Sequence, residues 1–196
     1  MADLLVLAPL RIECRAARRG ARRASVMRTG MGARRAREAA VEARGRPARA
    51  VAVLGFCGAL DSKLEPGDVV VADELRGAGE PIRCDRAPAL ADALERAGVR
   101  ARRGPLVSVE RIARGRERAQ LGESGAIAVD TESAWLAAAA AGRPLAALRA
   151  VVDTPDRELF RLSTVPAGLK AYRALARAAE ALESWSDSLP DEQEVS

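Results

Sequence analysis

The sequence predicts a single α/β domain built on a mixed β-sheet. Short apolar runs alternate with Ala- and Arg-rich stretches, a pattern typical of strands joined by helices. The chain has 196 residues, of which 48% are apolar, so one domain with a sizeable core is expected. The runs 50–54 and 69–72 are separated only by glycines and a Pro-Gly-Asp turn. Because a crossover helix does not fit there, we expect antiparallel as well as parallel pairs.

The N-terminal half contains two strand–helix units followed by a central strand. The first apolar run ends at Pro9, and the second passes through Gly30-Met31-Gly32 into an amphipathic pattern. The third run is the clearest buried strand, and its trailing glycines indicate a backbone bend against a ligand or another strand. The strands expected here are 4–8, 25–29 and 50–54, with one helix that ends near Gly20 and another over 33–44.

The C-terminal half continues the alternation and closes with a long helix. An apolar run from residue 126 leads into an Ala-rich helix opened by Glu132, and the charged stretch 111–121 indicates a helix or a lid. Apolar residues recur at a helical period over 167–185, which is typical of core packing. The remaining expected elements are strands 69–72, 105–109 and 148–153, a helix over 89–97, and loops over 73–88 and 156–166.

The positive charge is almost entirely arginine and is concentrated near the N-terminus. The net charge is +5, and residues 1–50 contain thirteen arginines against four acidic residues. Such a surface would suit a phosphate backbone, but this stretch lacks the aromatic residues that stack on bases. Solvated Arg-rich helix faces are therefore the favoured interpretation, and a non-catalytic, nucleic-acid-binding α/β module is the alternative.

The residue types present exclude several kinds of chemistry. The chain has no histidine, which rules out Ser-His-Asp and Cys-His catalysis, so acid–base work must fall to Asp or Glu. Cys14, Cys57 and Cys84 are odd in number and far apart, which predicts buried, reduced thiols and neither a disulfide framework nor a zinc site. The chain starts with an apolar strand without a basic leader, and no apolar run reaches the ~18 residues of a membrane span. We expect a cytoplasmic protein without a metal or cofactor.

Two acidic residues lie where apolar runs end. Glu132 follows one such run and Asp153 ends another. In open α/β sheets, ligands bind beyond the carboxyl ends of strands, so together these acids predict a small-molecule site. Taken singly, Glu132 would be an ordinary acid in a first helical turn and Asp153 a turn residue. Glu13, about one turn into the first helix, is a further candidate because a carboxylate there can activate a water.

Five motifs occur in an order that resembles the nucleoside phosphorylase and nucleosidase superfamily. They are PLRIE, TGMG, GFCGALDSKLEPGDVVVADE, AIAVDTESA and LRAVVDTPD, and the resemblance runs from residue 4 to about residue 185. That superfamily contains purine nucleoside phosphorylase, methylthioadenosine/S-adenosylhomocysteine nucleosidase and futalosine hydrolase. The resemblance implies a three-layer α/β/α sandwich over residues 1–188 and a homodimer. The acidic composition of residues 189–196 itself predicts a flexible tail.

The resemblance also assigns roles to individual residues. Glu13 matches the glutamate that activates water, Asp153 the aspartate that assists the departing purine, and Glu132 the glutamate that binds the ribose hydroxyls. The other substrate-binding positions are Met31, Gly32, Phe56, Gly58 and Thr131, and the possible phosphate-binding positions are Arg11, Arg28 and Gly30. Carboxylates fit this chemistry because glycosidic cleavage passes through an oxocarbenium-like state.

The nucleophile is expected to be water. Val53 and Phe56 lie where phosphorylases of one branch carry an arginine and a serine that bind phosphate. A phosphate dianion left with Arg11 alone would be held poorly, since charge-assisted contacts do most of that work. Arg11 and Arg28 together keep phosphorolysis open as an alternative.

The predicted substrate is an adenine nucleoside with a modified 5′ group. The stretches GFCGALD and VDTPDREL most resemble the short branch associated with hopanoid biosynthesis, whose members are thought to remove adenine from adenosylhopane and leave ribosylhopane. Such an apolar substrate would imply transient membrane contact. Methylthioadenosine-type substrates are the second alternative and futalosine the third.

Overall fold

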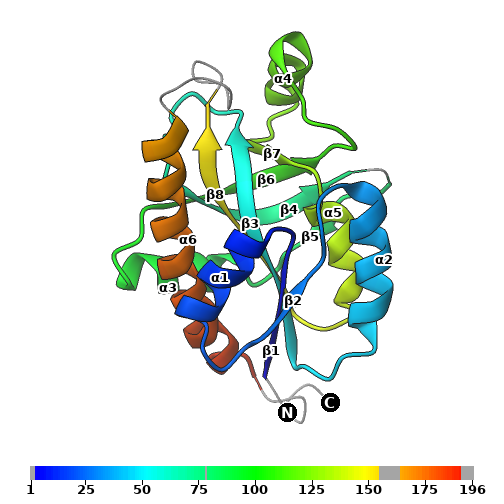
Figure 1. The fold of residues 1–196 in the computed structure, drawn as a ribbon. Helices are drawn as coiled ribbons and strands as arrows, with labels where there is room; N and C mark the ends of the chain where they lie inside the picture. Colours follow the sequence, from blue (N-terminus) through cyan, green and yellow to red (C-terminus); the bar gives the residue numbers. More distant parts are fainter. Residues whose placement is uncertain (1–2, 78, 155–163, 191–196) are drawn as a thin grey trace.

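A computed structural model describes residues 3–77, 79–154 and 164–190 (Figure 1). Its strands are β1 (Leu4–Ala8), β2 (Ser25–Arg28), β3 (Ala50–Ala59), β4 (Val69–Arg76), β5 (Ile82–Arg83), β6 (Ala101–Ser108), β7 (Ala128–Asp130) and β8 (Leu145–Asp153). Its helices are α1 (Arg11–Gly20), α2 (Ala33–Arg44), α3 (Ala87–Arg96), α4 (Gly115–Glu123), α5 (Ser133–Leu136), the 3-10 turn η1 (Ala137–Ala139) and α6 (Thr164–Asp187).

The eight strands form one mixed sheet that curls back on itself. Its strand order is β2-β1-β3-β7-β6-β4-β5, and β8 pairs with both β3 and β4. The β1–β2, β1–β3, β3–β8, β4–β6 and β6–β7 pairs are parallel, whereas β3–β7, β4–β8 and β4–β5 are antiparallel. Helices α1, α3 and α6 cover one side of the sheet and α2 and α5 the other (Figure 1). This arrangement confirms the predicted α/β class and the mixed sheet.

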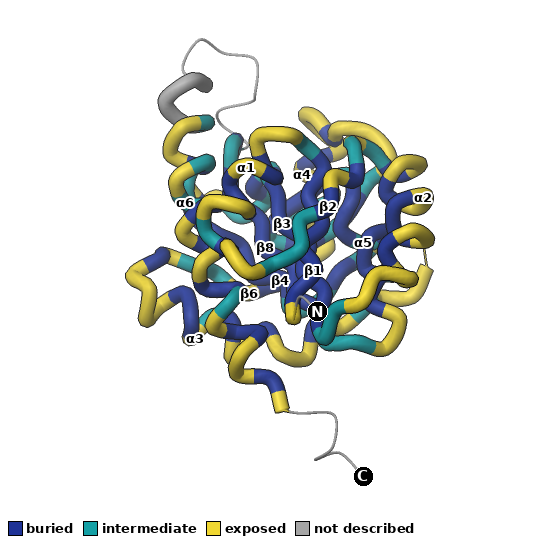
Figure 2. The backbone as a smooth tube through the Cα atoms, turned by 60° about the horizontal axis from the view of Figure 1, so that its bottom comes forward, coloured by how far each residue is buried: buried dark blue, intermediate teal, exposed yellow. Residues whose placement is uncertain are grey.

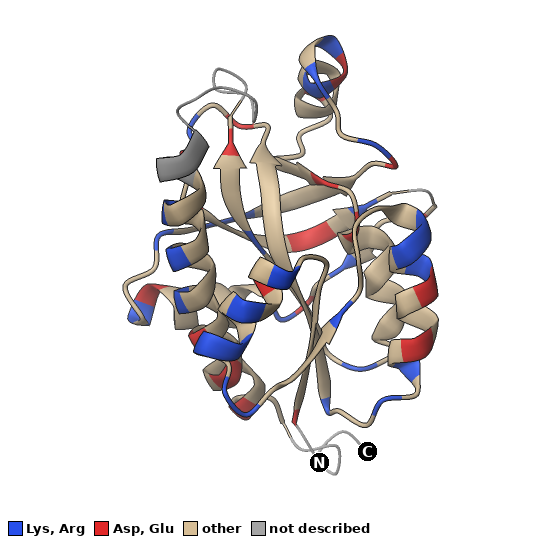
Figure 3. Ribbon diagram, viewed as in Figure 1, with Lys and Arg blue, Asp and Glu red and all other residues tan. Residues whose placement is uncertain are grey.

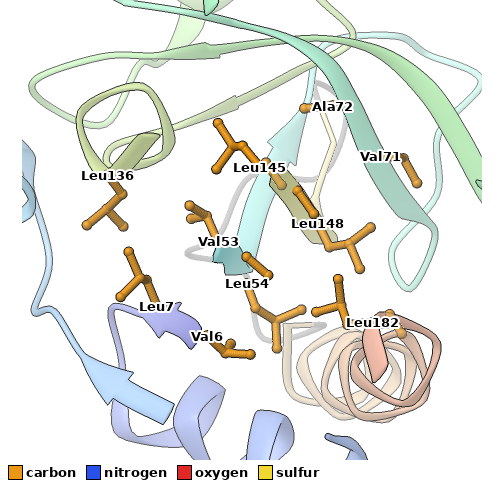
Figure 4. Close-up of a cluster of buried hydrophobic side chains, with 14 of the residues drawn as sticks. Val6, Leu7, Val53, Leu54, Val71, Ala72, Leu136, Leu145, Leu148 and Leu182 are labelled. Carbon is orange, nitrogen blue, oxygen red and sulfur yellow. The ribbon is translucent and has the colours of Figure 1, made fainter. Parts of the chain in front are cut away.

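Small and branched aliphatic side chains fill the core. Figure 2 shows the central strands buried beneath helices whose outer faces are exposed. In Figure 4, residues of β1, β3 and β8 meet Leu182 of α6 in one buried cluster, among them Val6, Leu54 and Leu148. Alanine-rich helices suit this packing because short side chains let helix backbones approach the sheet closely. The three cysteines are free and buried, as predicted.

Several elements are longer than the local pattern predicts. Strand β3 does not end at Leu54 but continues through the glycines to Ala59, with a register shift against β8 between Cys57 and Gly58. The stretch expected as a loop over 73–88 contains the end of β4, the short strand β5 and the start of α3. Cross-strand hydrogen bonds extend these strands beyond the apolar residues that suggest them.

The C-terminal region begins its helix early and packs against the sheet. Helix α6 starts at Thr164, three residues before the predicted start, and most of the loop expected over 156–166 lies outside the described residues. Leu189, assigned to the tail by the sequence, is buried, and its carbonyl accepts a hydrogen bond from Arg49. The rest of the predicted tail, from residue 191, also lies outside the described part of the chain.

Candidate active site

A cavity of about 370 Å³ opens where β1, β3, β7 and β8 end. It contains seven of the residues predicted from the sequence, and it is lined by Pro9, Leu10, Glu13, Met31, Phe56, Cys57, Gly58, Val109, Ile112, Ala113, Arg118, Val129, Asp130, Thr131, Glu132, Val152 and Asp153. Strands β7 and β8 are not paired with each other but both border the last residues of β3. Glu132 and Asp153, which follow or end those strands, therefore reach the same cavity from two sides.

Glu13 is held rigidly by two backbone amides. Its Oε2 accepts a 2.6 Å hydrogen bond from the amide of Leu10, and its Oε1 accepts a 2.8 Å bond from the amide of Phe56. The side chain is 2% exposed, and burial raises the pKa of its carboxyl, although the positive charge of Arg149 and the two amides oppose that rise. A buried carboxylate with a raised pKa is suited to accept a proton near neutral pH.

Glu132 is oriented by its neighbours at the entrance to α5. Its Oε1 accepts a 2.9 Å hydrogen bond from the amide of Gly32 and another from the hydroxyl of Thr131. Gly32 does not itself line the cavity, so its contact is with Glu132. With one oxygen occupied in this way, the carboxylate can still accept hydrogen bonds from paired hydroxyl groups.

Asp153 forms a buried ion pair with an arginine that the sequence did not single out. Nη2 of Arg118, on α4, lies 2.9 Å from Oδ1 of Asp153, and both side chains are 6% exposed. Arg118 also donates to the carbonyl of Ala59 at 3.1 and 2.7 Å. Gly58 makes room for the pair, because a Cβ there would lie 2.6 Å from Oδ1 of Asp153. The sequence indicated a charged helix or lid over 111–121, but a helical pattern alone does not tell which charge turns inward.

Arg149 is a second buried arginine that the sequence pattern did not single out, and it lies beside the site without lining the cavity. It lies on β8, is fully buried, and its Nη2 is 2.7 Å from Asp130 and 3.9 Å from Glu132. It also donates to the hydroxyl of Ser133 at 3.0 and 2.9 Å. The sequence does contain a signal for Arg149, since it is the only charged residue within the apolar run 145–152. An arginine in a buried strand predicts an ion pair, because charged side chains are rarely buried without a partner.

Asp130 anchors this network from β7. It accepts hydrogen bonds from the hydroxyls of Ser108 at 2.5 Å and Ser133 at 2.6 Å, in addition to its ion pair with Arg149. Because Arg149 is held by Asp130, its positive charge lies between the carboxylates of Glu132 and Glu13, and it acts electrostatically on both. The arrangement offsets part of the repulsion between those two acids.

A second, basic cavity of about 630 Å³ adjoins the first and shares Pro9, Leu10 and Met31 with it. The predicted phosphate-binding residues Arg11, Arg28 and Gly30 line this second cavity and not the first. Figure 3 shows that helices α1 and α2 both carry arginines. The sequence-predicted residues thus divide between two neighbouring cavities.

Within the described residues, no group of Cys, Asp or Glu side chains is arranged to hold a metal ion. Over the same part of the chain, no helix combines the length and apolar character needed to cross a bilayer.

Comparisons with known proteins agree with this fold. Residues 12–183 match the phosphorylase superfamily. The fold is similar to a 5′-methylthioadenosine/S-adenosylhomocysteine nucleosidase from Neisseria meningitidis in complex with methylthio-immucillin-A, with a TM-score of 0.77, 20% identity, and coverage of 94% of this chain and 100% of that chain. It is also similar to futalosine hydrolase of Helicobacter pylori, with a TM-score of 0.77, 18% identity, and coverage of 95% and 97%. A sequence comparison with curated proteins returns no match. The family match covers most of the chain, and the protein is therefore an enzyme of the phosphorylase superfamily.

Proposed function

We propose that the protein hydrolyses the N-glycosidic bond of a purine nucleoside that carries a modified 5′ group. The observation that carries this proposal is the convergence of three buried carboxylates, Glu13, Glu132 and Asp153, on one cavity. Carboxylates stabilise the positive charge that develops on the sugar as the bond breaks. The similar structures include nucleosidases for methylthioadenosine and S-adenosylhomocysteine and a futalosine hydrolase, which supports a purine nucleoside as substrate.

In the proposed reaction, Glu13 takes a proton from a water whose oxygen attacks C1′ of the ribose. The bond between C1′ and the purine nitrogen breaks, its electron pair leaves with the base, and the base takes up a proton from solvent water. Glu13 then returns its own proton to solvent. Glu132 binds the ribose hydroxyls and Asp153 hydrogen-bonds the departing purine. Nη2 of Arg118 lies 2.9 Å from Oδ1 of Asp153 and holds this carboxylate at the cavity.

Water is favoured over phosphate by the residues next to Glu13. Val53 is fully buried, and the amide of Phe56 is already bound to the carboxylate of Glu13. A phosphate dianion at this position would also face two buried carboxylates, Glu13 and Glu132, which repel it. The second candidate function is phosphorolysis, and it is favoured by Arg11 and Arg28 in the adjoining cavity.

The 5′ group is the least constrained part of the substrate. An apolar group, as in adenosylhopane, is supported by the exposed side chains of Ile12, Met31 and Ile112 around the two cavities. A methylthio group would fit the same surface. The homodimer, the cytoplasmic location and the transient membrane contact predicted from the sequence stay predictions.

The test is to incubate the purified protein with adenosine, methylthioadenosine and an adenosine bearing a long alkyl 5′ group, with and without phosphate. We expect free adenine and the free sugar without phosphate, and loss of both products in Glu13→Gln. Glu38→Gln, which removes an exposed carboxylate on α2, is the matched control. Release that requires phosphate would support the phosphorylase alternative. If no nucleoside is cleaved and the protein instead binds DNA or RNA with a steep salt dependence, the nucleic-acid-binding alternative is correct.

A further inference from the structure

The basic cavity beside the candidate active site has no acidic lining. Its charged residues are Arg11, Arg28 and Arg35, which come from α1, β2 and α2. Among the described residues, none that lines this cavity is a carboxylate, and none forms an ion pair with any of the three arginines. Three uncompensated positive charges around one cavity indicate an anion site, because guanidinium groups bind carboxylate and phosphate oxygens directly.

Arg35 differs in this respect from two other arginines of its helix. On the same helix α2, Arg34 lies 2.7 Å from Glu38, and Arg37 lies 3.1 Å from Glu110. Arg35 instead extends over Gly30, where a Cβ would lie 2.7 Å from Cδ of Arg35. Gly30 has a φ of +80°, which a residue with a side chain rarely adopts, so the turn both leaves space for Arg35 and requires glycine.

The shared residues connect this cavity to the sugar end of the active site. The active site has a base end, where Asp153 meets Gly58 and Arg118, and a sugar end, where Glu132 accepts the hydrogen bond from the Gly32 amide. Met31 precedes Gly32 and lines both cavities. In a nucleoside the 5′ carbon is attached across the ribose ring from the base, so a 5′ substituent can extend past Met31 into the basic cavity.

The charge distribution places the anion away from the reacting carbon. The carboxylates of Glu13 and Glu132 line the active site but not the basic cavity, so an anion is attracted to the second cavity and repelled from the first. We propose that the basic cavity binds an anionic group at the end of the 5′ substituent of the substrate. This inference rests on the proposed nucleosidase function and favours an acidic 5′ extension over the apolar 5′ group considered above.

The experiment compares two adenosines that differ in one charge, a 5′-(3-carboxypropylthio) derivative and its methyl ester. For the wild-type protein we expect a higher kcat/KM for the acid than for the ester. In the double variant Arg28→Gln/Arg35→Gln we expect this ratio to fall by about ten-fold or more, since one charge-assisted contact contributes that much. The ratio should also fall as salt is added, because the contact is partly exposed. Arg15→Gln, which removes an exposed arginine of α1 outside the cavity, should leave the ratio unchanged.

Calorimetric titration of the same two nucleosides gives the ratio of their Kd values without turnover, so the inference is tested even if cleavage fails. An acid-to-ester ratio of one, or a ratio that the double variant does not lower, overturns the inference. Tighter binding of the ester assigns an apolar 5′ group and overturns it too. If cleavage of both nucleosides needs phosphate, and the double variant raises the KM for phosphate equally with both, the cavity binds free phosphate and the inference is wrong. Absence of cleavage with an intact binding ratio rejects the proposed reaction alone.

Discussion

Two buried arginine–carboxylate pairs lie against β3, and they differ in where the arginine comes from. Near Glu13, a Cβ on Gly55 would lie 2.1 Å from Nη1 of Arg149, a core residue of β8. Near Asp153, a Cβ on Gly58 would lie 2.7 Å from Nη2 of Arg118, which belongs to the nine-residue helix α4. In both places a glycine of β3 leaves space for a guanidinium.

The difference suggests different roles for the two arginines. Arg149 is enclosed by Asp130, Glu132 and Ser133, so its position is set by the core. Arg118 is carried by an element that projects from the body of the molecule in Figure 1. Arg149 therefore provides a fixed positive charge near Glu13 and Glu132. The contact of Arg118 with Asp153 depends instead on the position of α4.

The largest expected effect is the loss of Glu13, the proposed general base next to Arg149. Glu13→Gln removes the proton acceptor while keeping the shape of the side chain, and we expect kcat to fall by about 10²–10⁴-fold. Adenine release at substrate saturation measures it. Asp153→Asn tests the carboxylate paired with Arg118 in the same assay. Wild-type turnover in Glu13→Gln would mean that another group activates the nucleophile.

The next largest effect is on the free energy of unfolding, which should distinguish the Arg149 ion pair from the Arg118 ion pair. Arg149→Met leaves Asp130 and Glu132 buried without their cation, and breaking a buried ion pair costs about 3–5 kcal/mol of unfolding free energy. Urea unfolding followed by circular dichroism measures this cost. Arg34→Met, which removes an exposed i,i+4 pair, is the control and should change stability by no more than about 0.5 kcal/mol.

Arg118→Met should cost less than Arg149→Met, about 1–3 kcal/mol, because the carboxylate of Asp153 faces a cavity that water can enter. Its effect on catalysis should appear as a lower kcat, because Asp153 loses the ion pair that holds its carboxylate at the cavity. Arg118→Lys should restore most of the wild-type kcat. An Arg118→Met variant as unstable as Arg149→Met would remove the distinction between the two pairs.

Alanine at either glycine tests whether space for the guanidinium is what these positions require. Gly55→Ala and Gly58→Ala should each destabilise the fold by about 1–3 kcal/mol through overpacking. Thermal unfolding measures both, and Gly45→Ala, at the exposed end of α2, is the matched control. The double variant Gly55→Ala/Arg149→Met should recover part of the loss if the clash is with Arg149.

The smallest expected effect is the pH dependence of kcat/KM that arises from Glu13. Burial raises the pKa of Glu13, and the residue must be ionised to accept a proton. Activity should therefore be lost as pH falls through this raised pKa, so that the acid limb of kcat/KM lies above the ordinary range of a glutamate. A profile of kcat/KM between about pH 4 and 8 locates the acid limb. A limb at the ordinary glutamate pH would show that the amides and Arg149 outweigh burial.

The sequence predicted the carboxylates of the site better than their counter-charges. Glu13, Glu132 and Asp153 follow or end apolar runs, and local pattern identifies such positions. Arg118 is one of several charged residues in a short helix with little amphipathic pattern, and only its packing against Ala59 and Asp153 turns it inward. The glycines of β3 predict a backbone bend against a ligand or another strand, whereas in the structure they leave space for Arg118 and Arg149. Local sequence does not reveal this role, because both arginines come from distant segments.

The sequence by itself determined the fold class, the family and the absence of histidine chemistry, because these depend on residue types, local periodicity and motif order. Tertiary structure decided which arginine meets which carboxylate, where β3 ends, and how the predicted residues divide between two cavities. Those outcomes depend on contacts such as Gly58 with Arg118 and Gly55 with Arg149, which join segments far apart in the chain. Local patterns carry no information about such contacts, since burial and ion pairing are set only when the sheet closes and the helices pack on it.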